Sequence, residues 1–252
     1  MEDAKENLQT LAIWVKKAKR IVFFGGAGVS TESGIPDFRS EDGLYRQSFR
    51  YPPEMMLSRS FFDSHPEEFF DFYRKKMVAP NVQPNPAHQV LAQWEKEGRL
   101  SVVITQNIDG LHQMAGSRHV LELHGSVHRN RCMECSKAWP LEKVMESEGI
   151  PRCDCGGIIK PEVVLYEEPL DREVMVQAVQ ALQKADLLII GGTSLAVYPA
   201  AGLIQYYGGE RLVLINRSQT PMDKEADLCF RGKIGEVLDK VNQYASYLPE
   251  PK

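Results

Sequence analysis

The stretch Gly25-Gly26-Ala27-Gly28-Val29-Ser30-Thr31-Glu32-Ser33-Gly34-Ile35-Pro36-Asp37-Phe38-Arg39 decides the fold that this sequence predicts. It follows an apolar run over residues 21–24, which predicts a buried strand. In α/β proteins, a strand that leads through a Gly-Ala-Gly turn into a helix binds a pyrophosphate, because small residues let the backbone approach and the helix N-terminus offers N–H groups. Thr31 replaces the third glycine of the dinucleotide fingerprint G-x-G-x-x-G. The turn therefore favours a phosphate site but does not by itself identify a dinucleotide.

Apolar runs and helical periodicity alternate along the rest of the chain. We expect buried strands over residues 101–105, 120–123, 163–166, 187–190 and 211–215. Helices are expected over residues 4–19, from Ser64-x-Pro66, from Asn85-Pro86, over 171–184 and over 233–246. Residues 40–60 have no clear period, and Tyr51-Pro52-Pro53 is expected to break any helix there. This alternation predicts an α/β fold with a doubly wound, Rossmann-like parallel sheet.

Length and composition limit the class of protein. With 252 residues the chain can form one large domain or a large and a small one. Its 43% hydrophobic and 25% charged residues are typical of a soluble globular protein. A net charge of −4 gives no overall attraction to nucleic acid, so no direct nucleic-acid binding is expected. The charged start and the lack of a long apolar run predict a cytoplasmic protein with no membrane partner.

Four of the five cysteines form two close pairs, Cys132-x-x-Cys135 and Cys153-x-Cys155, separated by 17 residues. Four thiolates in two pairs are the usual ligand set of a tetrahedral structural Zn²⁺. Because the segment between the pairs has few apolar residues, we expect the metal to hold this module together in place of a core. A redox dithiol is the alternative, with Cys229 as an additional thiol.

Polar side chains follow three of the predicted strands. Gln106-Asn107-Ile108-Asp109 comes after the strand at 101–105, His124-Gly125 after 120–123, and Gly192-Thr193-Ser194 after 187–190. Ligands of open α/β sheets bind outside the carboxyl ends of the strands, so these residues are candidates for one site. Amides and a carboxylate suit a ribose and a carboxamide, and a histidine suits a general base, with Gly125 leaving room for a substrate. A polar turn and a structural histidine are the alternatives.

Together these motifs resemble the sirtuin family, the NAD-dependent protein-lysine deacylases, in the same order and from about residue 8 to about residue 245. The resemblance implies His124 as the catalytic base and Asn107 as a second catalytic residue. It implies four zinc ligands, Cys132, Cys135, Cys153 and Cys155, and a lysine channel lined by Val164, Tyr166 and Val197. The NAD contacts that it implies are Gly26, Ala27, Gly28, Ser30, Asp37, Phe38, Arg39, Gln106, Asn107, Ile108, Asp109, Gly192, Thr193, Ser194, Asn216, Arg217 and Lys233.

The resemblance also implies a reaction and a division of the chain. NAD and an acylated lysine would give nicotinamide, O-acyl-ADP-ribose and free lysine, so the expected partners are acylated proteins, bound by a monomer. Protein ADP-ribosylation at the same NAD site is the alternative, and a non-catalytic NAD-binding module is disfavoured by the presence of Asn107, Asp109 and His124. The implied segments are an NAD-binding domain over 1–39, 81–125 and 161–252, a helical insertion over 40–80 and a zinc module over 126–160.

The sequence departs from the family pattern at two places. The second cysteine pair is C-x-C where the family most often has C-x-x-C, and Tyr166-Glu167-Glu168 replaces Phe-Gly-Glu. Sirtuins that remove acidic acyl groups have a tyrosine and an arginine three residues apart on the helix lining the acyl pocket, where this chain has Phe70 and Tyr73. We therefore expect acetyl-lysine to be preferred over succinyl-lysine, with the neighbouring Arg74 as the cation if it is not.

Overall fold

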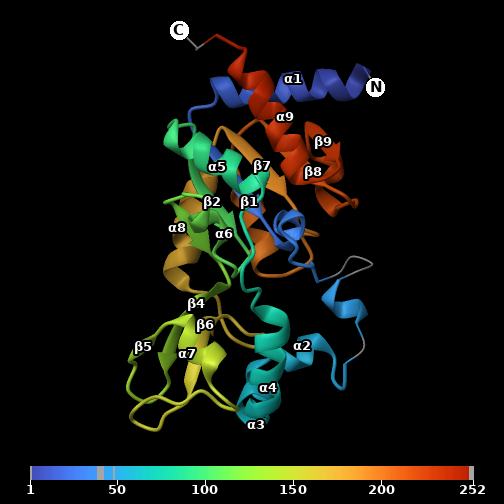
Figure 1. The fold of residues 1–252 in the computed structure, drawn as a ribbon. Helices are drawn as coiled ribbons and strands as arrows, with labels where there is room; N and C mark the ends of the chain where they lie inside the picture. Colours follow the sequence, from blue (N-terminus) through green and yellow to red (C-terminus); the bar gives the residue numbers. More distant parts are fainter. Residues whose placement is uncertain (1, 39–42, 48, 250–252) are drawn as a thin grey trace.

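The computed structural model describes residues 2–38, 43–47 and 49–249, without the side chains of residues 2–4 and 46. Figure 1 shows a large part built on the main sheet and a small part below it that carries α2, α3, α4, α7 and the strands β4, β5 and β6. Among the described helices, none combines the length and the hydropathy that a membrane span requires.

The large part is a six-stranded sheet in the order β3-β2-β1-β7-β8-β9, and all its strand pairs are parallel. The predicted doubly wound sheet is thus confirmed. The order reverses between β1 and β7, which is where such sheets open a crevice at the carboxyl ends of the strands. The strands are β1 (Ile21–Gly25), β2 (Leu100–Thr105), β3 (Val120–Glu122), β7 (Leu187–Gly191), β8 (Leu212–Asn216) and β9 (Leu228–Arg231).

Alternate residues of the strands face two separate apolar cores. Phe23 and Ile189 pack on one side and their neighbours Phe24 and Ile190 on the other, because side chains alternate across a strand. The first core is covered by α1 (Glu2–Lys17), α5 (Pro86–Lys96) and α9 (Ile234–Ser246), the second by α8 (Arg172–Lys184) and the 3₁₀ segment Ala200–Tyr206. The near-continuous apolar runs of the sequence therefore reflect burial on both faces.

The small part contains an antiparallel sheet in the order β5-β4-β6 and a group of short helices. The expected strand at 163–166 is wrong in part, since β6 ends at Val163 and belongs to this small sheet. The elements are α2 (Pro53–Met56), α3 (Arg59–Ser64), α4 (Pro66–Phe72), a π-helical turn (Tyr73–Met77), β4 (Gly125–Cys132), β5 (Ala138–Trp139), α7 (Leu141–Glu146) and β6 (Ile159–Val163).

Two expectations for residues 40–66 are corrected. A helix does begin at Pro53, because proline is tolerated at the first position of a helix and breaks only its interior. Ser64 does not begin α4 but ends α3, and His65 stands at the N-cap before Pro66. The aromatic residues of α4 are part of the core.

The helical insertion and the zinc module share one apolar core. Phe69, Phe70 and Tyr73 are fully buried in it together with Val144 and Ile159 from the other segment. The expectation that metal replaces the core of the module is therefore incomplete, because its apolar residues find partners about 70 to 90 positions earlier in the chain.

Two histidines, His88 and His112, are fully buried and in contact with each other. His88 accepts a hydrogen bond on Nδ1 from the Asn85 backbone N–H at 3.2 Å, which gives it a structural role at the start of α5. Its ring contacts that of His112, on the short helix α6 (Leu111–Met114), with 4.7 Å between the ring centres. Nε2 of His88 and both ring nitrogens of His112 find no hydrogen-bond partner among the described residues. Burial lowers the pKa of His88 to about 4 and that of His112 to about 3.

This pair predicts that the folded protein loses stability on mild acidification. In the unfolded chain both imidazoles titrate near about 6.5, so at pH 5 the unfolded state binds more protons than the folded state. The free energy of unfolding should fall from pH 7 to pH 5 by up to about 1.4 kcal/mol per pH unit and per histidine below the unfolded pKa. Urea unfolding at both pH values measures this. His112→Leu should flatten the pH dependence, and an unchanged pH dependence would contradict the assignment.

Candidate functional site

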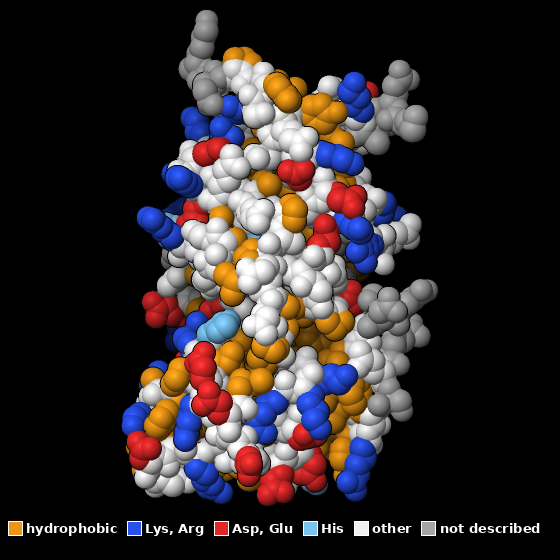
Figure 2. All heavy atoms as spheres, viewed as in Figure 1, with side chains coloured by type: hydrophobic (Ala, Val, Ile, Leu, Met, Phe, Trp, Pro, Cys, Tyr) orange, Lys and Arg blue, Asp and Glu red, His pale blue; other side chains and the backbone are white. Residues whose placement is uncertain are grey.

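A cavity of about 910 Å³ lies at the carboxyl ends of the strands, between the large and the small part. Figure 2 shows hydrophobic side chains gathered where the two parts meet. Arg39 lies outside the described residues, and the other predicted NAD, catalytic and substrate residues all line this cavity. These are Gly26, Ala27, Gly28, Ser30, Asp37, Phe38, Gln106, Asn107, Ile108, Asp109, His124, Val164, Tyr166, Gly192, Thr193, Ser194, Val197, Asn216, Arg217 and Lys233.

The glycine turn differs from the expected strand–turn–helix. After β1 the chain forms two 3₁₀ turns, Ala27–Val29 and Thr31–Ser33, so the predicted helix N-terminus for a pyrophosphate is wrong. The glycines serve a close approach of two loops instead. A Cβ on Gly28 would lie 2.8 Å from the Cα of Gly192, and one on Gly26 would lie 2.8 Å from the Cβ of Thr193.

Ser30 connects two polar residues of the predicted NAD site. Its hydroxyl donates to the Asp109 carboxylate at 2.6 Å and accepts from the Asn107 amide at 3.0 Å. Asp109 also accepts the backbone N–H of Leu111 at 2.9 Å. These bonds hold an amide and a carboxylate in fixed orientations at the end of β2, with Asn107 nine-tenths buried.

Thr193 joins the ends of three strands. Its hydroxyl accepts from the Gln106 amide at 3.0 Å, and its backbone N–H and C=O bond the side chain of Asn216 at 3.0 and 2.9 Å. Asn216, for which the resemblance implies a ribose contact, thus uses its amide first to connect β8 to β7. These hydrogen bonds fix the polar groups on the cavity floor, so the groups do not have to reorganise when a ligand binds.

The residues around the cavity fit a dinucleotide. Its volume is at the upper end of the about 300–1,000 Å³ that ligand pockets have. Buried amide and hydroxyl groups lie on its floor, and Arg217 and Lys233 supply positive charge along one side, as two phosphates require.

His124 lies between β3 and β4 and borders the same cavity. Its Nδ1 is 3.0 Å from the Gln106 carbonyl oxygen. Because a carbonyl only accepts, Nδ1 carries the hydrogen and Nε2 keeps a free lone pair. Burial lowers the pKa of His124, and the bond to Gln106 offsets part of that effect. The imidazole is therefore neutral at physiological pH and is able to accept a proton.

Gly125 is needed for a reason other than the one expected. Its φ is +75°, and a Cβ there would lie 1.9 Å from the carbonyl oxygen of Glu162 on β6. The glycine makes room for the neighbouring strand, not for a substrate.

The segment around Tyr166 is fastened to the helical insertion. The Tyr166 backbone N–H donates to Leu57 and its C=O accepts from Arg59, both at 3.0 Å. Glu167, which replaces the family's glycine, adopts a φ of +76°. Its carboxylate accepts the N–H of Ser60 at 2.8 Å and the hydroxyl of Ser60 at 2.9 Å. These two bonds offset the roughly 1 kcal/mol that such a φ costs a non-glycine residue.

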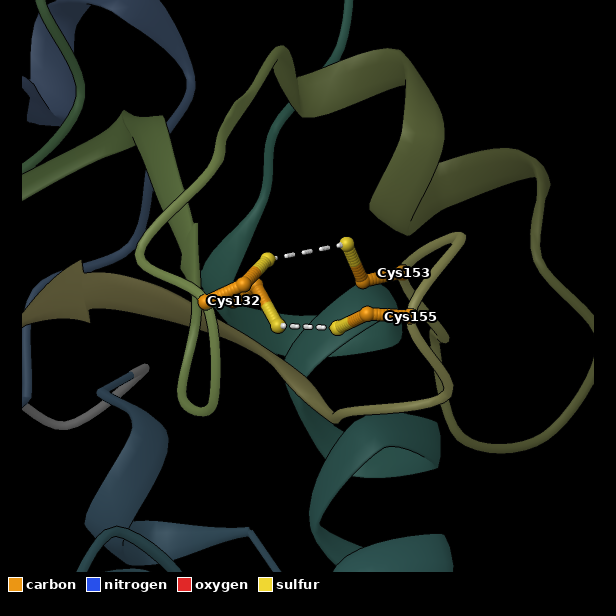
Figure 3. A group of neighbouring side chains, drawn as sticks. Cys132, Cys153 and Cys155 are labelled. Atoms are coloured by element: carbon orange, nitrogen blue, oxygen red, sulfur yellow. Dashed lines mark hydrogen bonds between the residues drawn. The ribbon is translucent and has the colours of Figure 1, made fainter.

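The four clustered cysteines form a site suited to zinc. All four Sγ atoms lie within 4.8 Å of one another; Cys132 ends β4, Cys135 follows it, and Cys153 and Cys155 precede β6 (Figure 3). The closest pairs, Cys132–Cys155 at 3.4 Å and Cys135–Cys153 at 3.6 Å, are near the about 3.8 Å expected for tetrahedral ligands with Zn–S bonds of about 2.3 Å. A backbone N–H within each motif lowers the pKa of Cys132 and of Cys153, the latter to about 6.

This geometry favours the metal over the redox alternative. A dithiol needs two sulfurs, whereas here four converge, and sulfurs of the two motifs approach one another. The C-x-C pair still supplies an amide, because the Cys155 N–H bonds the sulfur of Cys153. Cys229 lies on β9, away from the cluster, with its thiol 3.6 Å from the carbonyl oxygen of Asp223.

Comparison with known proteins decides the family. The model of the Sir2 family matches residues 26–199. The chain belongs to the Sir2 family.

Relatives agree along nearly the whole chain of this Sir2 protein. The NAD-dependent protein deacetylase of Clostridium acetobutylicum is 59% identical over 94% of this chain and 98% of its own length. A structure described as the basis for the mechanism and regulation of Sir2 enzymes superposes with a TM-score of 0.88 at 40% identity, over 97% of this chain and all of that chain. A Sir2 variant with a deacetylated p53 peptide and 3′-O-acetyl-ADP-ribose gives a TM-score of 0.85 at 37% identity, over 94% and 97% of the two chains.

Sequence reasoning missed three residues that border the cavity in this Sir2 protein. Glu32 accepts the N–H of Gly235 at 2.8 Å and so occupies the start of α9, His128 contacts the Asp109 carbonyl at 3.0 Å, and Tyr45 bonds Tyr166. Tyr45 lies in the stretch without periodicity, so no pattern pointed to it. The one available signal for the bond between Tyr45 and Tyr166 was the tyrosine at position 166, where the family usually has phenylalanine.

The cysteine cluster predicts one zinc per chain. Cys153→Ala should release the metal and lower the thermal unfolding temperature, because metal binding contributes to folding free energy here. Elemental analysis and thermal unfolding measure the two effects. Cys229→Ala is the matched control and should keep zinc and stability. Full stability of Cys153→Ala, or a wild-type chain without zinc, would overturn the site.

Proposed function

We propose that this Sir2 protein is an NAD-dependent deacetylase of protein lysines that releases nicotinamide, O-acyl-ADP-ribose and free lysine. The observation that carries the proposal is the meeting, in one cavity, of a neutral histidine, a fixed amide–carboxylate pair and the three residues assigned to the lysine channel. The family and the name of the Clostridium relative support the same reaction.

In this proposal the floor of the cavity binds NAD. The glycine turn would lie against the pyrophosphate of NAD. Arg217, after β8, and Lys233, before α9, would offset the charge of its phosphates. Asn107, Ile108 and Asp109 orient the nicotinamide and its ribose, and Phe38 excludes water from the reacting carbon. NAD supplies the ADP-ribosyl group that accepts the acyl group as nicotinamide leaves. Asp37 and Arg39 remain assigned to the same region by resemblance.

His124 is proposed as the general base. Its neutral imidazole has a free Nε2 and a fixed orientation, so it can take the proton from a ribose hydroxyl when that hydroxyl attacks the acyl carbon. Asn107 is positioned by Ser30 to donate an amide hydrogen bond in the same region. Val164, Tyr166 and Val197 would line the path of the lysine side chain.

His124→Ala should lower the rate of deacetylation by about 10²–10⁴-fold, as is usual for loss of a general base. Binding of NAD should survive. His119→Ala, at an exposed histidine away from the cavity, is the control and should be active. In the wild type, kcat/KM should rise with pH along an acid limb whose midpoint lies below about 6.5, because burial lowers the pKa of the base. Near-normal turnover of His124→Ala would remove it from this role.

The products distinguish deacetylation from ADP-ribosylation. Mass spectrometry after incubation with NAD and an acetyl-lysine peptide should find O-acetyl-ADP-ribose and a peptide lighter by one acetyl group. A protein heavier by one ADP-ribose would support the alternative transferase.

The acyl end of the cavity is apolar. Tyr73 lines it and is fully buried, Val78 lines it and is buried, and Met77, Leu141 and Met145 line it and are partly buried. Arg74 does not border it, because its guanidinium donates to the carbonyls of Val144 and Gly149 and lies over the Phe70 ring. Lys76 does border it, but its amine donates to Gln47 at 2.9 Å. An acidic acyl chain would therefore lose hydration without gaining a free cation among these residues.

Acetyl-lysine peptides should exceed succinyl-lysine peptides in kcat/KM by at least about tenfold, or about 1.4 kcal/mol. Steady-state assays with two peptides that differ only in the acyl group measure this. The ratio should be unchanged in Lys76→Ala. Equal activity on succinyl-lysine in the wild type, lost in Lys76→Ala, would identify Lys76 as an acyl-binding cation and refute the apolar pocket.

The remaining assignments belong to the same proposal. The protein would act in the cytoplasm as a monomer on acetylated proteins, without binding nucleic acid. The NAD-binding domain would comprise residues 1–39, 81–125 and 161–252, with the helical insertion at 40–80 and the zinc module at 126–160. The shared core of the last two supports their acting as one body against the sheet.

A further inference from the structure

Two tyrosine hydroxyls meet across the cavity. The Oη atoms of Tyr45 and Tyr166 are 2.6 Å apart, although 121 positions separate the residues in sequence. Both residues border the cavity, and Tyr166 is more than one-third exposed. In the family that the chain resembles, the Tyr166 position usually holds phenylalanine, which has no hydroxyl to make this bond.

Tyr45 is fixed to the residues assigned to the cofactor. Its backbone N–H donates to the Phe38 carbonyl at 2.9 Å, and the preceding Leu44 N–H donates to Asp37 at 2.8 Å. The Tyr45 ring meets the Phe38 ring edge-on, with 5.6 Å between centres. Main-chain hydrogen bonds thus hold Leu44 and Tyr45 against Asp37 and Phe38, and the Tyr45 ring packs on the Phe38 ring.

Tyr166 is itself one of the residues assigned to the lysine channel, and it is fixed to the helical insertion. Both of its backbone groups bond the helical insertion, at Leu57 and Arg59. The following Glu167 adds two bonds to Ser60. The Tyr166 ring therefore has a defined place beside Val164, and its hydroxyl is the group that reaches the cofactor side.

We propose that the Tyr45–Tyr166 hydroxyl pair is a positioning pair that couples the binding of the cofactor to the binding of the acylated peptide. The inference rests on the proposed function. Because the bond joins the two sides, a ligand that holds one side in the position where the bond forms also favours that position of the other side, so each ligand raises the affinity for the other by the same factor. Neither hydroxyl is assigned a chemical step.

The test measures this coupling factor in the full chain. The dissociation constant of an acetyl-lysine peptide is measured by calorimetry without and with saturating ADP-ribose, which binds without reacting, and the reciprocal experiment checks consistency. Tyr166→Phe removes one oxygen and keeps the ring. The coupling factor should fall by about 2- to 10-fold, the range of one neutral hydrogen bond.

Tyr45→Phe should reduce the coupling factor as much as Tyr166→Phe, and the double variant should lose no more than either, because all three remove the same bond. Tyr247→Phe, at a highly exposed tyrosine after α9, is the matched control and should keep wild-type coupling. Thermal unfolding verifies that each variant is folded.

Wild-type coupling in the two single variants would overturn the inference. So would additive losses in the double variant, or a loss of peptide affinity that is equal with and without ADP-ribose, because each shows that the hydroxyls act separately. The proposed function fails independently, if the wild type gives no O-acetyl-ADP-ribose from NAD and the peptide.

Discussion

The close approach of Gly28 to Gly192 is the constraint on which the rest of the site depends. The Gly28 N–H donates to the Gly192 carbonyl at 2.8 Å, and neither residue leaves space for a Cβ. This contact brings the loops after β1 and β7 together where the strand order reverses. Thr193 then lies beside Gln106 and Asn216, and Ser30 lies beside Asn107 and Asp109. A side chain at either glycine would separate the loops and disperse these polar groups.

The wall opposite the sheet is held by different forces. There the helical insertion and the zinc module bury their aromatic and aliphatic residues against one another, and four cysteine side chains converge within the module. Apolar burial is not directional, so it positions this wall less sharply than hydrogen bonds do. The backbone bonds of Tyr166 to Leu57 and Arg59 add the direction that packing lacks.

Much of the fold and site followed from local patterns. The strands were predictable because burial on both faces makes them continuous apolar runs, and the site residues because they follow those strands. What failed depended on distant contacts. The glycines of the turn read as a phosphate loop, yet their smallness serves Gly192 and Thr193. Gly125 read as space for a substrate, yet it faces Glu162. The position of Tyr45 in the site could not be predicted from the sequence, because its partners Phe38 and Tyr166 come together only in the folded chain.

Glu167 shows how such a distant contact restricts the evolution of this chain. A glycine adopts a φ of +76° without strain. A glutamate there is strained, and its hydrogen bonds to Ser60, 107 positions away, offset that strain. The two positions are therefore epistatic. A lineage that exchanged glycine for glutamate before it had a hydroxyl at position 60 would have had only the backbone N–H of that residue to offset the strain, and one that now loses the Ser60 hydroxyl returns to that state. The order in which substitutions are acceptable is thus set by the conformation of one backbone residue.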